Sequence, residues 1–90
     1  MIRVSYNGLI ADIRDNDLKD AISFLSSESE SVRKQILQSV VSALDKVLGK
    51  LEKNEKISSK EMQDTANDIC LWFANETIEG RAEQYKQQIQ

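Results

Sequence analysis

The residues of this chain best suited to molecular recognition are acidic side chains near its C-terminus. In a helix they would share one face, because at 100° per residue their spacing keeps them within an arc of about 120°. Trp72 lies midway along the same arc. An aromatic ring among carboxylates can anchor a basic protein while the acids steer its approach. The candidate binding face consists of Asp64, Asp68, Trp72, Glu76, Glu79 and Glu83, and Glu61 extends its acidic part.

The same residues also have a purely structural interpretation. Charged residues on the outer face of an amphipathic helix commonly serve for solvation, and Trp72 would then be a core residue covered by the N-terminal segment. A row of lysines, Lys46, Lys50 and Lys53, is open to two interpretations as well. It can complement the C-terminal end of a helix dipole, or it can bind an anionic partner such as the acidic face of a second copy.

The residue types needed for catalysis are scarce. The chain has no histidine, the most common general base and metal ligand. Its single cysteine, Cys70, lies on an apolar helix face with no histidine to activate it, which favours a buried thiol over a nucleophile. The three glycines are scattered and form no phosphate-binding loop. We expect a protein that is not an enzyme and that holds neither a metal ion nor another cofactor.

Charge is distributed unevenly along the chain. The 90 residues carry a net charge of −3, but residues 32–60 hold seven bases against three acids. Residues 1–31 hold six acids against three bases, and residues 61–90 hold six acids against two bases. The acidic arc would repel phosphates, so we expect a protein partner and no nucleic acid.

The N-terminal residues 1–13 fit two structures. Asn7-Gly8 is a strong signal for a two-residue hairpin turn, because a type I′ turn needs positive φ at both positions. Such a hairpin pairs Tyr6 with Leu9 and places six apolar side chains on one face: Ile2, Val4, Tyr6, Leu9, Ala11 and Ile13. It also sets Arg3 opposite Asp12 on the other face. A helix is the alternative, because Ile2, Tyr6, Leu9 and Ile13 also follow helical spacing.

Apolar periodicity predicts three helices after this segment, at residues 16–26, 29–53 and 59–88. Ser27 with Glu30, and Ser58 with Glu61, have the spacing of capping boxes. Gly80 either ends the last helix or is carried through it at a cost of about 1 kcal/mol. We therefore expect a single, mainly α domain over residues 1–90. Its architecture is a small three-helix bundle with an N-terminal β-hairpin, or a four-helix bundle if residues 1–13 are helical.

A second apolar row lies beyond the expected bundle. It consists of Ile78, Ala82, Tyr85 and Ile89, and in a helix that overhangs the domain it would need a partner to be buried. This row makes a homo-oligomer possible. No stretch approaches the length and apolar content of a membrane span, and no signal peptide opens the chain, so we expect a cytoplasmic protein.

Residues 36–75 resemble small helical bacteriocin immunity proteins. The resemblance lies in Leu44-Asp45-Lys46-Val47, Lys50-Leu51-Glu52-Lys53, the polar turn and the apolar helix that follow. It implies a bacterial, cytoplasmic helical bundle that protects its producer from a toxin by direct binding. The hypothesis is a non-enzymatic toxin inhibitor whose acidic, Trp72-containing face binds a basic toxin domain. The alternative is a self-associating helical adaptor or structural component of a phage or secretion system.

Overall fold

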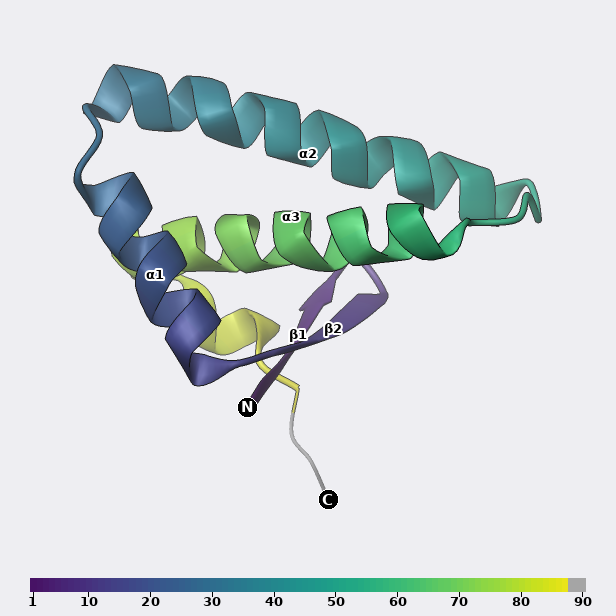
Figure 1. Ribbon diagram of the computed structural model, residues 1–90, viewed down its shortest axis with the longest axis horizontal. Coiled ribbons are helices and arrows are strands. Elements are labelled where there is room, and N and C mark those ends of the chain that lie inside the picture. Colours follow the sequence, from purple (N-terminus) through teal and green to yellow (C-terminus); the bar gives the residue numbers. More distant parts are fainter. Residues whose placement is uncertain (88–90) are drawn as a thin grey trace.

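A computed structural model describes residues 1–87 of the chain and shows a mainly helical protein with an N-terminal two-stranded sheet (Figure 1). Helix α3 lies between α2 on one side and the hairpin on the other, and α1 crosses its C-terminal half (Figure 1). This arrangement confirms the three-helix architecture with a hairpin and not the four-helix alternative. In chain order the elements are β1 (Ile2–Tyr6), β2 (Leu9–Ile13), α1 (Asp15–Ser26), α2 (Glu30–Glu52), α3 (Ser59–Ile78) and the 3₁₀ helix η1 (Ala82–Tyr85).

The hairpin has the predicted register. Tyr6 pairs with Leu9 and Arg3 with Asp12, and the Arg3 guanidinium donates to the Asp12 carboxylate at 2.9 Å. Asn7 and Gly8 adopt φ values of 48° and 95°, as a type I′ turn requires. All six apolar residues of the predicted inner face are buried or half-buried against the helices. The turn residues therefore decide the structure of this segment in favour of the hairpin.

Caps define where the longer helices begin. Ser58 Oγ accepts a hydrogen bond from the Glu61 amide at 3.1 Å, which confirms the predicted N-cap of α3. The predicted cap of α2 is wrong by two residues: Ser29, and not Ser27, accepts from the Val32 amide. Ser27 instead donates its hydroxyl to the Phe24 carbonyl at the end of α1. With Ser29 as the cap, α1 and α2 are connected by residues 27–29, one residue more than expected.

The predicted last helix over residues 59–88 is too long. Helix α3 ends at Ile78, and Gly80 follows with φ 79°. The Gly80 amide donates to the Thr77 carbonyl and the Arg81 amide to the Glu76 carbonyl, which is the Schellman pattern of a helix C-terminus. A left-handed glycine reverses the chain here, so η1 folds back onto the core instead of extending α3.

The same reversal changes the role of the second apolar row. Ile78, Ala82 and Tyr85 are half-buried and pack against the core of the same chain. They do not form one exposed stripe on an overhanging helix, and Ile89 lies outside the described residues. The structural basis for the predicted oligomer stripe is therefore absent from residues 1–87.

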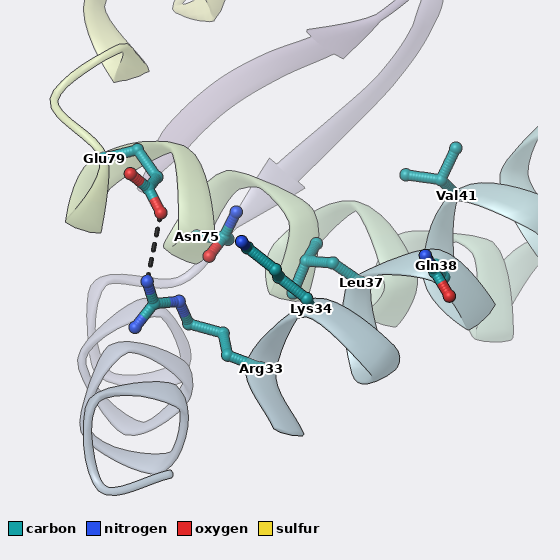
Figure 2. Close-up of a pocket in the computed structure, with 7 residues that line it drawn as sticks. All are labelled: Arg33, Lys34, Leu37, Gln38, Val41, Asn75 and Glu79. Atoms are coloured by element: carbon teal, nitrogen blue, oxygen red, sulfur yellow. Dashed lines mark hydrogen bonds and ion pairs between the residues drawn. The ribbon is translucent and has the colours of Figure 1, made fainter. Parts of the chain in front are cut away.

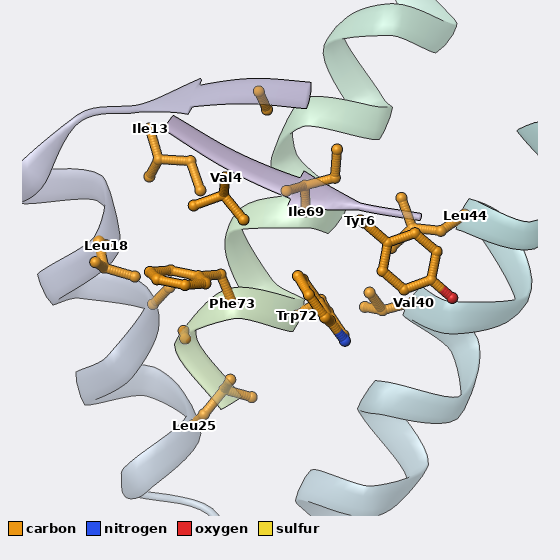
Figure 3. Packing of buried hydrophobic residues seen from close by; sticks show 13 residues of the cluster. Val4, Tyr6, Ile13, Leu18, Leu25, Val40, Leu44, Ile69, Trp72 and Phe73 are labelled. Carbon is orange, nitrogen blue, oxygen red and sulfur yellow. The ribbon is translucent and has the colours of Figure 1, made fainter. Parts of the chain in front are cut away.

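The core is built around α3. Its side chains Ile69 and Phe73 are almost fully buried, and Leu25 of α1, Leu44 of α2 and Val4 of β1 reach it from three directions (Figure 3). Helices α1 and α2 and strand β1 thus each contribute a fully buried apolar side chain. The hairpin, which would be marginal alone, is stabilised by this shared contact.

Two glycines provide a test of where α3 ends. Gly80→Ala should lower the free energy of unfolding by about 1 kcal/mol, because an L-residue is disfavoured in the left-handed region. Gly49→Ala, inside α2, should raise it by about 0.5–1 kcal/mol through helix propensity. Neither new methyl group would meet an atom within 4 Å, so sterics do not confuse the comparison. Urea unfolding measures both values, and a stabilising Gly80→Ala would mean that the helix continues.

Tyr6 provides a second test, through pH. Its hydroxyl donates to Asp45 Oδ1 of α2 at 2.9 Å. Burial first, then the hydrogen bond and negative charge of Asp45, raise the pKa of Tyr6 to about 12. In the unfolded chain the tyrosine pKa is about 10, so the unfolded state loses this proton at a lower pH than the folded state. The free energy of unfolding should therefore fall as the pH rises from about 10 to 12. Tyr6→Phe should cost about 0.5–1.5 kcal/mol at neutral pH and should flatten this part of the stability profile. An unchanged alkaline slope in Tyr6→Phe would contradict the buried hydroxyl.

Candidate binding surfaces around helix α3

Trp72 is a core residue and not an exposed anchor. Only 7% of its surface is exposed. Its ring lies edge-on to Tyr6, with centroids 4.9 Å apart, and edge-on to Tyr85, with centroids 4.5 Å apart. Figure 3 shows Trp72 between α3 and the hairpin, facing Tyr6. The structure therefore agrees with the interpretation of Trp72 as a core residue covered by the N-terminal segment, because β1 and η1 cover the side of α3 that α1 and α2 leave open.

Glu76 is buried as well, with 7% of its surface exposed. Arg81 Nε donates to the Glu76 carboxylate at 2.7 Å, and the arginine is brought there by the turn at Gly80. A buried carboxylate needs such a partner, because desolvation of an unpaired charge is costly. Glu76 therefore stabilises the chain reversal and is not available to another protein.

Three other acids of the candidate face are exposed but form ion pairs within the chain. Asp64 pairs with Lys60 at 3.0 Å, Glu79 with Arg33 of α2 at 3.0 Å, and Glu83 with Lys86 at 2.8 Å. Glu83 also lies on η1 and not on α3. Of the six predicted residues, two are thus in the core and three are in local ion pairs, which leaves Asp68, so the six do not form one acidic surface.

Asp68 is the predicted site residue with no ion pair in the part of the chain that the structure describes. Burial raises the pKa of its carboxyl group, and the negative charge of Asp64 raises it further. Both carboxylates line a groove of about 150 Å³ between α2 and α3, across from Lys46. The two acids therefore form a partly desolvated pair of like charges at the groove.

The lysine row also has a defined environment. Lys50 donates to Glu61 across the α2–α3 interface and is the main reason why the pKa of Glu61 is lowered. Lys46 lines the groove with Asp64 and Asp68, and Lys53 is exposed after the end of α2. This row therefore serves in part to join the two helices of the same chain.

Cys70 is half-buried, and burial followed by the charge of Asp17 raises the pKa of its thiol, as an unreactive cysteine requires.

A second groove lies between the first turns of α2 and the last turns of α3 (Figure 2). It measures about 270 Å³, and the Arg33–Glu79 ion pair closes one end. The Asn75 side chain points into this region, and its Oδ1 has no hydrogen-bond partner within residues 1–87. The groove is lined by basic, acidic, amide and apolar side chains together, so it shows no single ligand chemistry.

The third groove was not anticipated from the sequence. It measures about 390 Å³ and lies between the outer edge of β2 and the joined ends of α2 and α3. Large apolar side chains are exposed around it: Met62 is 62% exposed and Leu51 45%. The sequence pattern assigns both to buried helix faces, and only the position of the hairpin shows that they are left uncovered. The groove is lined by Leu9, Ile10, Ala11, Asp12, Val47, Leu51, Ile57, Met62, Thr65, Ala66 and Ile69.

The comparisons with known proteins leave these surfaces without a relative to interpret them. No protein-family model, curated protein or solved structure matches the chain. Within residues 1–87, no helix combines the length and apolar character that crossing a bilayer requires. No group of three potential metal-ligating side chains occurs in this described part either.

The Glu76–Arg81 pair can be tested by a double-mutant cycle with Glu76→Gln and Arg81→Ala. Because the carboxylate is buried, the coupling free energy should be about 1–3 kcal/mol. The exposed Lys60–Asp64 pair is the matched control, and its coupling should stay below about 0.5 kcal/mol. Urea unfolding of the single and double variants gives both values. Equal coupling in the two pairs would contradict the structural role of Glu76.

Proposed function

We propose that this chain is a non-enzymatic, toxin-neutralising protein of the immunity type that binds a basic domain of a protein toxin. The observation that carries the proposal is the Asp64–Asp68 pair beside the α2–α3 groove. Because burial and mutual repulsion disfavour the ionised form of Asp68, a lysine or arginine delivered by a partner would relieve this cost. A basic protein would therefore gain binding free energy at this point.

The proposed contact is smaller than the face derived from the sequence. It keeps Asp64 and Asp68 and excludes the buried Trp72 and Glu76. Asp64 would share its charge between Lys60 and the partner, whereas Glu79 and Glu83, which lie away from Asp68, would contribute only if the partner displaced Arg33 and Lys86. The alternative of a self-associating adaptor loses its support in the described residues, because Ile78, Ala82 and Tyr85 pack inward.

The proposal includes a cellular setting. An immunity-type protein acts on toxin that has reached, or is made in, the producing cell. We therefore place this chain in the bacterial cytoplasm, as part of the same proposal. The gene immediately upstream in the native host is the candidate source of the toxin.

The test is co-expression with the protein encoded by that upstream gene. The upstream protein alone should arrest growth, and the wild-type chain should restore it. The double variant Asp64→Lys/Asp68→Lys should fail to restore growth and should bind the purified toxin about tenfold or more weakly. Glu52→Lys/Glu55→Lys is the matched control, since it changes charge equally at exposed positions away from the groove.

Salt and folding controls complete the test. Binding of the wild-type chain should weaken with added salt, and circular dichroism should show that both double variants remain folded. Harmlessness of the upstream protein, or full protection by Asp64→Lys/Asp68→Lys, would overturn the proposal.

A further inference from the structure

The main chain of β2 is open along its outer edge. In a hairpin with a two-residue turn, the residues next to the turn exchange backbone hydrogen bonds, and every second residue from there points its N–H and C=O away from the partner strand. Since Tyr6 pairs with Leu9, the outward-pointing residues of β2 are Ile10 and Asp12. Within residues 1–87, no backbone group outside the hairpin bonds to either of them.

The opposite edge of the same sheet already carries a third extended segment. Lys86 forms a bridge with Val4, and the Gln87 amide donates to the Arg3 carbonyl at 2.8 Å. The sheet therefore accepts an added strand on the β1 side, where the chain supplies it. On the β2 side the equivalent position is empty in the described part of the chain.

The apolar groove lies under this empty position. A strand added to β2 would point alternate side chains toward the helices, as Leu9 and Ala11 do. Those side chains would meet Met62 and Ala66 of α3 and Leu51 of α2, which line the groove. Burial of these exposed apolar surfaces would favour binding, and the strand edge would supply the hydrogen bonds.

The helices determine what kind of partner fits. If β2 paired antiparallel with β2 of a second copy, the helix-facing sides of the two sheets would point in the same direction. The helices of both copies would then lie on that one side of the joined sheet. Helices α2 and α3 extend past the hairpin (Figure 1), and their side chains line the groove on the helix-facing side of the sheet beside β2. Two copies would therefore collide, whereas an extended segment without a helical layer would fit.

We infer that the outer edge of β2 binds an extended segment of a partner protein by strand addition. The segment carries apolar side chains at every second position, which enter the groove. A lysine or arginine stands opposite Asp12, whose carboxylate accepts hydrogen bonds from Arg3 on both oxygens and remains about half-exposed. This inference does not rest on the toxin-neutralising function, since the edge is separate from the Asp64–Asp68 pair.

The probe is a display library of random linear peptides, each about nine residues long, selected against the full chain. Enriched peptides should alternate apolar and polar residues and include a basic one. In hydrogen-exchange measurements, a synthetic selected peptide should protect the amides of Ile10 and Asp12. Ile10→Pro removes an outward N–H without removing a bond to β1, so peptide affinity should fall about tenfold or more. Ile10→Val keeps the N–H and should retain affinity.

Met62→Lys provides a second variant that does not alter the hairpin. It places a charge on the groove floor at a position already exposed to solvent, and it should also weaken binding about tenfold. The inference is overturned by enrichment of peptides with helical spacing, by no enrichment, or by equal affinity for the wild-type chain and Ile10→Pro. A wild-type dimer in sedimentation that Ile10→Pro dissociates would assign the edge to a second copy and overturn it as well.

Discussion

The structure depends on the burial of α3 by several neighbours at once. Ile69 and Phe73 are almost fully buried, and Trp72 lies between Tyr6 of the hairpin and Tyr85 of η1. A hairpin or a short helix is marginal alone in water, and a chain of 90 residues has little apolar surface to spare. Each outer element is therefore stabilised mainly by packing against α3, and the hydrophobic core lies where these packing contacts come together.

This constraint also locates the free surfaces. The C-terminal half of α3 is covered by α1, the hairpin and η1, whereas its N-terminal half extends with α2 beyond the hairpin (Figure 1). Both candidate binding surfaces consequently lie along the N-terminal half. The Asp64–Asp68 pair occupies the α2–α3 groove, and the strand-binding groove, with Met62 exposed in it, lies beside β2. One surface offers charge, and the other offers backbone hydrogen bonds with an apolar floor.

The parts of the fold that follow local rules could be predicted from the sequence. Asn7-Gly8 determines the hairpin register, and Ser58 with Glu61 marks the start of α3. The end of α3 was missed because apolar periodicity continues through Gly80, although the residues beyond it pack from a separate element. The candidate face failed for a related reason. The sequence leaves Trp72 open between an exposed anchor and a core residue, and only the tertiary structure shows that the hairpin and η1 cover it. The groove beside β2 depends wholly on such packing.

Trp72 makes the burial of α3 directly measurable, because it is the only tryptophan in the chain. Its fluorescence can be recorded with iodide, a charged quencher that does not enter protein cores, in the native state and in concentrated urea. Burial between Tyr6 and Tyr85 predicts weak quenching and blue-shifted emission in the native protein, and a large increase in quenching on unfolding. Equal quenching in the two states would mean that the hairpin and η1 do not close over α3, and the arrangement of both candidate surfaces would be wrong.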